Sequence, residues 1–364
     1  MWFRCRHVST TSRRAAYVAA AALAVVGCAI AGQIAQASTQ LSRTVTYVSV
    51  GCSPTANEAF LYNLAKFSSK YGIAPTCETV ATYPLSLEGV AQGSLDVAIT
   101  GVPQVATIAS SHLNNIKVVG GYEVAAQGLI FKNGFNPTSW SQLSGKNICG
   151  PGATGVGEML RIAIAQKDVK NVTLTETGYS PASNLQALKD GQCDALAMWS
   201  PVLDTAVADG YGHYSKQVDL NTATTIGPGN AVLIAGKYML NNRPLLVDFL
   251  KAYVQSMDYT RAHPTVWASL GAQLSGSSLR VVKESLAHGD ISYDIDVKGA
   301  EAAARYGVEF GYATSDTSAI IRKYIDASYL AAATGLPVSA ITKPLVFPCG
   351  KQVGSKPSCV AGKK

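Results

Sequence analysis

The sequence has little charge, few histidines and none of the short motifs that carry common enzyme chemistry. Charged residues make up 15% of the 364 residues and aromatic residues 8%, and the five histidines are scattered without metal-ligand spacing. No stripe of Lys and Arg interleaved with aromatic residues marks a nucleic-acid surface. GxSxG, HExxH and the P-loop are also absent. These absences predict a protein with no catalytic residues, no metal and no cofactor.

The first 37 residues read as an export signal. Four arginines precede an apolar run over 15–32, and Ala35-Gln36-Ala37 then matches a small-x-small cleavage site. An uncleaved anchor is the alternative, because the run is close to the length that spans a bilayer. A second alternative is a lipid on Cys28, which follows Val25-Val26-Gly27 as in a lipoprotein box. We therefore expect an exported protein, in the periplasm or on the outer face of the cytoplasmic membrane.

Cleavage would change both the charge and the cysteine count. Losing the four arginines lowers the formal charge from +7 to +3, which leaves the mature chain nearly neutral. Two of the eight cysteines are also lost, and an even number remains: Cys52, Cys77, Cys149, Cys193, Cys349 and Cys359. An even number in an exported chain favours disulfides over metal or redox chemistry. Cys349 with Cys359 would close a short loop and is the best single pair, while the other connectivities stay open.

One sequence unit occurs twice. The stretch LEGVAQGSLDVAITGVP ends at Pro103, and NLQALKDGQCDALAMWSP ends at Pro201. Each contains a Gly, an Asp three residues later and a Pro ten residues after the Gly. Each reads as the end of a helix, a left-handed Gly, a buried strand and a loop marked by Pro. Upstream of each copy, VTYVSVGCSPT and KNICGPGATG both predict a strand, a loop and the start of a helix.

The repeat predicts an α/β protein of two similar lobes with a ligand cleft between them. Strands are expected at 45–50, 76–82, 95–100, 116–119, 128–131, 146–149, 172–177, 193–199 and 230–235. Helices are expected at 54–70, 85–92, 155–166, 182–189, 202–208, 245–259, 266–274, 277–286, 297–310 and 317–331. The alternation of strand and helix implies parallel pairing. The helices after residue 240 are expected to pack on the first lobe.

The breaks in this pattern predict the domain boundaries. Residues 38–131 would form the first part of lobe 1, and the break at Asn136-Pro137 marks the crossing into lobe 2. Lobe 2 would span 132–228, and 229–345 would return to lobe 1. The polar, Lys-rich tail over 346–364 is expected to be loosely ordered.

Two loops before helices are candidates for binding an anionic group. The Gly150–Gly155 loop opens a helix whose N–H groups and dipole favour negative charge, and Thr154 adds a hydroxyl. The first-lobe loop around Ser53 and Thr55 has the same chemistry. The alternative is that Ser53 and Thr154 are ordinary helix caps.

Aromatic and polar residues near strand ends are further candidates for lining the cleft, because these ends line the crevice of an open α/β sheet. Trp199 ends a buried strand and precedes Ser200-Pro201. Packing or a solvated loop is the alternative for each candidate. The full predicted binding set is Ser53, Thr55, Tyr83, Gly101, Tyr122, Glu123, Gln127, Thr154, Gly155, Tyr179 and Trp199.

These stretches together resemble the nitrate/sulfonate/taurine type of substrate-binding protein of bacterial ABC transporters. LSGKNICGPGATGVGEML, GQCDALAMWSPVL and GSLDVAITGVPQVATIA carry the resemblance, and FLKAYVQSMDYTRAHP and YIDASYLAAAT extend it. It implies a two-lobed periplasmic-binding-protein fold of type II. It also implies lobe closure around a small anionic or zwitterionic solute, and ABC permease and ATPase subunits as partners.

The resemblance also assigns roles to single residues. The taurine-binding members have a DAxxxWxP pattern, which here is Asp194 to Pro201, and their Ser-Thr loop falls on Ala153-Thr154. Thr154 would then contact an anion. Their acidic residue at a strand entry falls on Gln127, which offers no carboxylate to an ammonium, although Glu123 can substitute.

Three other readings stay open. Gly150, Gly152 and Gly155 satisfy GxGxxG, and Glu176 lies where a ribose-binding acid belongs, so an exported NAD(P)-dependent oxidoreductase is one alternative. An enzyme of the thiamine-pyrimidine synthase kind shares the binding-protein fold, but its Cys-rich signature is absent. The third alternative is a ligand-sensing lobe that reports to a partner.

Overall fold

The computed structural model describes residues 45–152, 154–347 and 349. Within these ranges, no helix is both long and apolar enough to cross a bilayer. The predicted export signal over 1–37, the lipid on Cys28 and the tail residue Cys359 lie outside the described residues. The Cys349–Cys359 pairing therefore stays a prediction.

Strands that are far apart in sequence form the first sheet. Its order is β11-β4-β10-β3-β1-β2, in which β1 is parallel to β2 and β3, whereas β10 is antiparallel to β3 and β4. The strands are β1 (Thr46–Cys52), β2 (Ile73–Thr79), β3 (Val97–Gly101), β4 (Lys117–Val124), β10 (Asn230–Ala235) and β11 (Asp290–Ile291). We call this sheet and the helices packed on it the first lobe.

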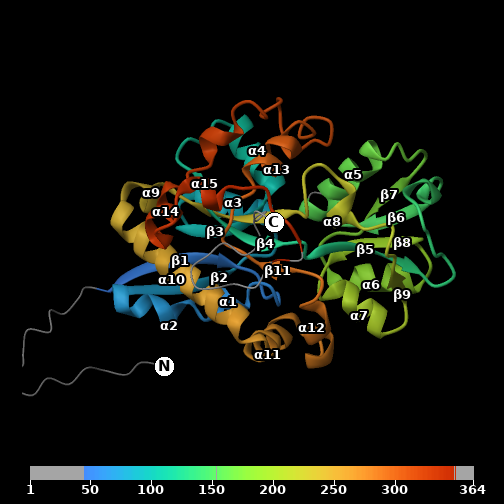
Figure 1. The fold of residues 1–364 in the computed structure, drawn as a ribbon, viewed down its shortest axis with the longest axis horizontal. Helices are drawn as coiled ribbons and strands as arrows, with labels where there is room; N and C mark the ends of the chain where they lie inside the picture. Colours follow the sequence, from blue (N-terminus) through green and yellow to red (C-terminus); the bar gives the residue numbers. More distant parts are fainter. Residues whose placement is uncertain (1–44, 153, 348, 350–364) are drawn as a thin grey trace, which may run out of the picture. The chain divides into compact units, whose positions relative to one another are not determined.

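Two groups of helices cover the first sheet, and Figure 1 shows them on its opposite sides. In one group α10 packs against α1, α2 and α14, and in the other α4 packs against α3 and α13. The helices are α1 (Ala59–Tyr62), α2 (Leu64–Ser68), α3 (Tyr83–Gln92), α4 (Val102–Ser110), α9 (Lys237–Asn241), α10 (Arg243–Ala262), α11 (Pro264–Ser275), α12 (Leu279–Ser285), α13 (Val297–Ala304), α14 (Ser328–Thr334) and α15 (Val338–Ile341). Single 3₁₀ turns lie at Ser69–Tyr71 and Ile321–Tyr324.

The second sheet has the order β7-β6-β8-β5-β9 and forms the second lobe with its own helices. β6 is parallel to β7 and β8, and β5 is antiparallel to β8 and β9. Figure 1 shows α5 and α8 on one side of this sheet and α6 and α7 on the other. The elements are β5 (Gln127–Lys132), β6 (Asn147–Gly150), β7 (Thr173–Glu176), β8 (Ala195–Trp199), β9 (Gly212–Tyr214), α5 (Gly155–Gln166), α6 (Pro181–Lys189), α7 (Val202–Ala208), α8 (Leu220–Ala223) and a 3₁₀ turn at Trp140–Leu143.

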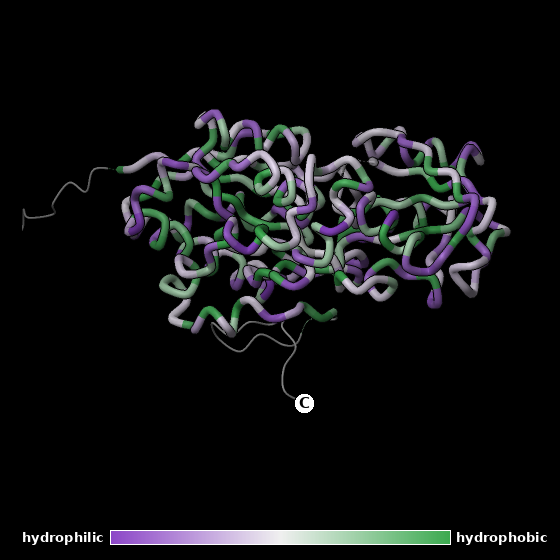
Figure 2. Tube along the Cα trace, turned by 90° about the horizontal axis from the view of Figure 1, so that it is seen from above, coloured by the Kyte–Doolittle hydropathy of each residue, from purple (hydrophilic) through white to green (hydrophobic). Residues whose placement is uncertain are grey.

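Each lobe has its own apolar core, and Figure 2 shows hydrophobic segments running through the interior of the molecule. In the first lobe, α10 buries Leu246, Phe249, Leu250, Tyr253 and Met257, which recur at the spacing of one helical face. Tyr253 also donates its hydroxyl to the Gly121 carbonyl at 2.8 Å. The second-lobe cores pack on both faces of β8. The prediction that the late helices pack mainly on the first lobe is thus consistent with the core, although Ala303 of α13 also reaches a second-lobe core.

The repeated unit has the same hydrogen bonds in both lobes. Asp96 accepts the backbone N–H of Ser49 at 2.8 Å, and Asp194 accepts the N–H of Asn147 at 3.0 Å, each across 47 residues of chain. Each Asp also donates its own N–H to the carbonyl of the residue that it holds. Gly93 and Gly191 both take the left-handed conformation after a helix, as the sequence predicts. The Asp therefore fixes the entry of one strand against the start of another in each copy.

Three predicted helices are wrong in extent, and one of them, expected over 297–310, ends at Ala304. The helix expected over 54–70 begins only at Ala59, because the Glu58 carboxylate turns back to accept the Ser53 N–H at 2.5 Å and so stabilises a turn. The helix expected over 317–331 is broken, because Ile325 bridges to Val118 of β4 and is extended there. Local propensity is outweighed by tertiary pairing in this last helix.

The crossing between the lobes also differs from the predicted boundary. β5, expected in the first lobe, pairs with β8 in the second sheet, so the chain crosses between β4 and β5 through Ala125 and Ala126. Ala125 has a φ of 63°, and it donates its N–H to the Pro228 carbonyl of the returning chain at 2.9 Å. Parallel pairing holds only in part, because the crossing strands β5 and β10 run antiparallel to their neighbours.

Candidate functional site

A cavity of about 400 Å³ lies between the two lobes. Pockets that bind small-molecule ligands in other proteins have volumes in this range. First-lobe residues on its wall are Ser53, Pro54, Thr55, Asn57, Glu58, Thr79, Val80, Ala81, Thr82, Tyr83, Tyr122 and Glu123. Gln127, Thr154, Gly155, Val156, Tyr179, Pro181 and Trp199 come from the second lobe. The loops that follow β1 and β6 therefore face one space, as the repeat implies.

Ten of the eleven predicted binding residues line this cavity. The exception is Gly101, which ends β3 and is buried behind Tyr83, since a Cβ there would lie 3.1 Å from Tyr83 Cδ2. Gly101 therefore makes room for a wall residue instead of forming the wall. Whether the ten residues contact a ligand stays a prediction.

Two buried carboxylates form the acidic part of the wall. Glu58 is 1% exposed and Glu123 is 6% exposed. Glu58 accepts the Ser53 N–H, and Glu123 accepts Asn57 Nδ2 at 3.1 Å. Glu123 follows Tyr122 at the end of β4, and Glu58 lies in the turn before α1. Two acids from separate elements thus converge on one side of the cavity.

Burial controls the electrostatics of these acids. Loss of hydration raises the pKa of Glu58 to about 8, and repulsion from Glu123 adds to the rise while the Ser53 N–H opposes it. Burial also raises the pKa of Glu123, against hydrogen bonds from Asn57, Gln127 and Tyr122. Burial therefore favours the protonated form of both acids, and for Glu58 this holds near neutral pH.

The second-lobe wall is built on the pairing of β5 with β8. Gln127 and Trp199 are directly opposite in this antiparallel pair, so the strand register sets them side by side. Gln127 is 9% exposed, and its buried Oε1 accepts no hydrogen bond from the described residues. Tyr83, Tyr122 and Tyr179 complete the aromatic wall.

The hydroxyl of Thr154 is already engaged. It donates to the Pro151 carbonyl at 2.8 Å and accepts the Gly157 N–H at 3.1 Å, which caps α5. Its only proton is therefore used within the loop, and the predicted hydroxyl donation to an anion has no proton available in this arrangement. The capping interpretation that the sequence left open describes Thr154 correctly.

The GxGxxG loop has no space for a dinucleotide. A Cβ on Gly152 would lie 1.9 Å from Glu176 Oε1, and Glu176 pairs with Arg161 at 2.9 Å. The expected ribose-binding acid therefore fills the space over the loop. Only about 20 Å³ remains open beside Gly150 and Gly152.

Sequence reasoning missed Asn57 and Glu58 as wall residues. Both fall in the first turns of the helix expected over 54–70. The available signal was the Pro at position 54 together with an acid, Glu58, directly before the apolar-rich segment AFLYNLAKF. A buried acid beside such a segment needs a polar partner.

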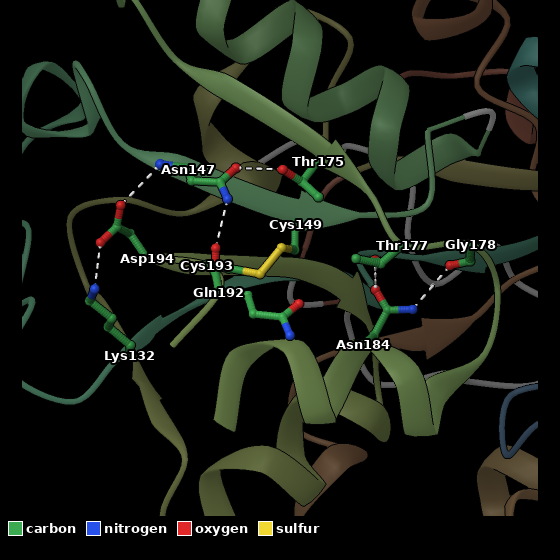
Figure 3. Close-up of a disulfide and its surroundings, with 10 residues drawn as sticks. All are labelled: Lys132, Asn147, Cys149, Thr175, Thr177, Gly178, Asn184, Gln192, Cys193 and Asp194. Atoms are coloured by element: carbon green, nitrogen blue, oxygen red, sulfur yellow. Dashed lines mark hydrogen bonds and ion pairs between the residues drawn. A yellow bond between two sulfur atoms is a disulfide. The ribbon is translucent and has the colours of Figure 1, made fainter. Parts of the chain in front are cut away.

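Disulfides hold the strands that carry the site loops. Cys52 at the end of β1 bonds to Cys77 of β2, and Cys149 of β6 bonds to Cys193. Figure 3 shows the second bond beside Asn147 and Asp194. The loop after β1 therefore follows the disulfide-bonded Cys52 directly. The loop after β6 follows Gly150, which is the neighbour of the disulfide-bonded Cys149. Within the described ranges, no three His, Cys, Asp or Glu side chains gather as metal ligands would.

Comparisons with known proteins support this architecture. The aliphatic sulphonate-binding protein SsuA of Escherichia coli is 18% identical, with a TM-score of 0.65 over 77% of this chain and 97% of that chain. The nitrate-binding protein NrtA of Synechocystis PCC 6803 is 15% identical, with a TM-score of 0.65 over 82% and 91%. The CA3427 product of Candida albicans, described as having the generic periplasmic-binding-protein fold, is 14% identical, with a TM-score of 0.62 over 78% and 96%.

These three relatives are described by binding or by fold and not by a reaction. A search of curated proteins finds no match. The family model described as "NMT1/THI5 like" matches residues 81–266, which is more than half of the 364 residues. The chain therefore belongs to the NMT1/THI5-like family and has the periplasmic-binding-protein fold.

Proposed function

We propose that this protein is the extracytoplasmic solute-binding component of an ABC importer. The observation that carries the proposal is the cavity of about 400 Å³ that both lobes line with aromatic and buried polar side chains. Sites of this size and lining suit a small organic molecule. The sulphonate- and nitrate-binding relatives support a solute-binding role. We expect the solute to be small and zwitterionic or anionic, as in the taurine and sulfonate group.

Lobe closure is the proposed mechanism. A solute held by the Glu123 side of the cavity would recruit the wall that carries Trp199, and the connections through Ala125 and back into β10 would bend. A few connecting residues are enough to absorb such a hinge motion. The closed form would then be recognised by a membrane permease with its ATPase, which places the protein in the periplasm or at the outer face of the cytoplasmic membrane.

A thermal-shift screen of residues 38–364 tests the proposal. The compounds are alkanesulfonates, taurine, nitrate, pyrimidines, aromatic acids and NAD(P). A solute present at 100 times its Kd should stabilise the fold by about 2.7 kcal/mol. A shift with one small organic solute supports the proposal, whereas a shift with NAD(P) alone would contradict it.

The role of Trp199 is tested with the solute that the screen identifies. Trp199→Ala should raise the Kd by about tenfold or more, because a buried aromatic wall residue contributes strongly to binding. Tyr238→Ala is the control, since this aromatic residue of α9 is 51% exposed and does not line the cavity. Calorimetric titration gives both values, and equal affinity of Trp199→Ala and the control would remove Trp199 from the site.

A further inference from the structure

The charges on the cavity wall are of one sign. Among the described lining residues there is no Lys, Arg or His, whereas Glu58 and Glu123 are both present and buried. A buried carboxylate is costly unless it is paired or protonated. The site therefore has carboxyl groups that can ionise beside a bound cation, and its described lining has no side-chain cation to balance a bound anion.

The Ser53 and Thr154 side-chain donors that the sequence offered to an anion are used within the protein. The Ser53 N–H bonds to Glu58, and the Ser53 hydroxyl lies 3.3 Å from the Val80 carbonyl, to which it donates. The Thr154 hydroxyl donates to Pro151. Both loops that would bind an anion thus use a side-chain hydroxyl donor on a backbone carbonyl of the protein.

Acceptors, by contrast, are in excess. Besides the two carboxylates, Gln127 lines the cavity with a buried Oε1 that accepts no hydrogen bond from the described residues. A buried acceptor without a donor costs free energy, which a ligand N–H can recover. Gln127 comes from β5 of the other lobe, and its side chain also forms a hydrogen bond with Glu123.

We propose that the cavity recognises a solute through a positively charged nitrogen, which Glu58 and Glu123 face from one lobe and Gln127 from the other. This inference rests on the proposed solute-binding function and narrows its ligand class. A cation can neutralise the buried acids, and its N–H groups can donate to the carboxylates and to Gln127 Oε1. Trp199 and the tyrosines supply faces that attract a cation and cover an apolar body. A zwitterion with an amino end fits this description, and a simple anion does not.

Matched sets of probes separate the head group from the body. Butylammonium and 2-phenylethylammonium are compared with the alcohols and the sulfonates of the same carbon skeletons, and taurine is added as a zwitterion. Calorimetric titration or thermal shift at pH 8 gives the order of affinity. The proposal expects the ammonium member of a set to bind at least about tenfold more tightly than its alcohol and its sulfonate.

Conservative variants test the acids directly. Glu123→Gln and Glu58→Gln should each weaken ammonium binding by about tenfold or more, while binding of the alcohol should change little. Glu158→Gln is the matched control. Glu158 of α5 is 1% exposed and burial also raises its pKa to about 8, yet it does not line the cavity. Melting curves for each variant show whether it is folded.

The pH dependence gives a second readout for Glu58. Below pH 8 its carboxyl holds a proton that a cation must displace, so ammonium affinity should rise from pH 6 to pH 8. The titratable groups that interact with Glu58 are Glu123, Tyr62, Tyr83, Tyr122 and Tyr253. The tyrosines stay neutral in this window, because burial raises the pKa of each one above 10. Glu58→Gln should flatten the rise, and Glu158→Gln should preserve it.

The outcomes distinguish the two proposals. Preferential binding of ammonium probes that depends on Glu58 and Glu123 supports both. Binding of sulfonates or alcohols with equal or greater affinity overturns the cation inference and leaves the solute-binding function standing. If neither these probes nor any compound of the wider screen binds, both proposals fail.

Discussion

The two lobes share the hydrogen bonds of the repeated Asp. They differ in how the residue before this Asp contacts the strand that leads into the site loop, β1 or β6. Leu95 precedes Asp96 as Cys193 precedes Asp194, and Gly51 lies two residues after Ser49 as Cys149 lies two residues after Asn147. In the second lobe these positions are joined by the Cys149–Cys193 disulfide (Figure 3). In the first lobe, the Leu95 side chain fills the space over Gly51, where a Cβ would lie 2.9 Å from Leu95 Cδ1.

This difference shows that a covalent bond and a packed side chain can solve one structural problem. The disulfide connects β6 to the residue before Asp194, at the entry to β8. The Leu95 contact connects β1 to the residue before Asp96, at the entry to β3. The first lobe adds its own disulfide further out, between Cys52 and Cys77 of the adjacent strands β1 and β2. A large core surrounds Leu95, which allows packing alone to hold the inner point.

The largest expected effect comes from removing the disulfides. Cys149→Ala with Cys193→Ala should cost about 4 kcal/mol of unfolding free energy, and Cys52→Ala with Cys77→Ala about 3.5 kcal/mol, because the bonds close loops of 44 and 25 residues. Chemical denaturation of each double variant measures both losses. A larger loss from the Cys52–Cys77 pair would contradict the chain-entropy explanation of the difference.

The packed counterpart should come next. Leu95→Ala should cost about 3 kcal/mol, because truncation leaves a cavity over Gly51 and Gly89, both of which lie against Leu95 Cδ1. Gly51→Ala should cost about 1–3 kcal/mol through overpacking against Leu95 and Ala98.

Combining these two changes sharpens the test. The double variant should be more stable than the sum of the single losses predicts, because the shortened Leu95 makes room for the new Cβ. Strict additivity in denaturant titrations would show that Leu95 does not fill the space equivalent to the Cys149–Cys193 bond.

The smallest expected effect concerns the shared Asp. Asp194→Asn should cost about 1 kcal/mol near pH 7, since it weakens a hydrogen bond to Asn147 N–H and a partly exposed ion pair with Lys132 at 2.7 Å. Burial alone would raise the pKa of Asp194, but the bonds from Lys132 and Asn147 and the nearby lysines lower it.

The sign of the pH effect follows from this lowered pKa. The stabilisation by Asp194 is present above the pKa of an unfolded Asp, near 3.9, and is lost as pH falls through the lower folded value. The gap in melting temperature between the wild type and Asp194→Asn should therefore shrink on acidification below about pH 4. Lys132→Gln is the control for the ion pair, and a gap that is constant with pH would show that the carboxylate charge contributes nothing.

Much of the fold was predictable because its signals are local. Helix α5 begins and ends at the predicted residues, since Thr154 caps it and its apolar residues recur with helical spacing. β10 and α7 also match. The helix α4 after β3 was missed, because Pro103 was interpreted as part of a loop although Pro is favoured in a first helical turn.

The sequence alone determined the repeat and, through it, most of the cavity wall. The Gly and Asp spacing of each copy follows from local backbone needs, namely a left-handed turn and a carboxylate acceptor, and these are written in neighbouring residues. Tertiary structure decided what spacing cannot encode. It placed β5 in the second sheet and Gly101 behind Tyr83, and it turned Glu58 toward Glu123 across 65 residues of chain. Such contacts depend on which surfaces meet after folding. The acidic character of the site therefore could not be predicted, because it requires two acids that are distant in sequence to lie together on one buried wall.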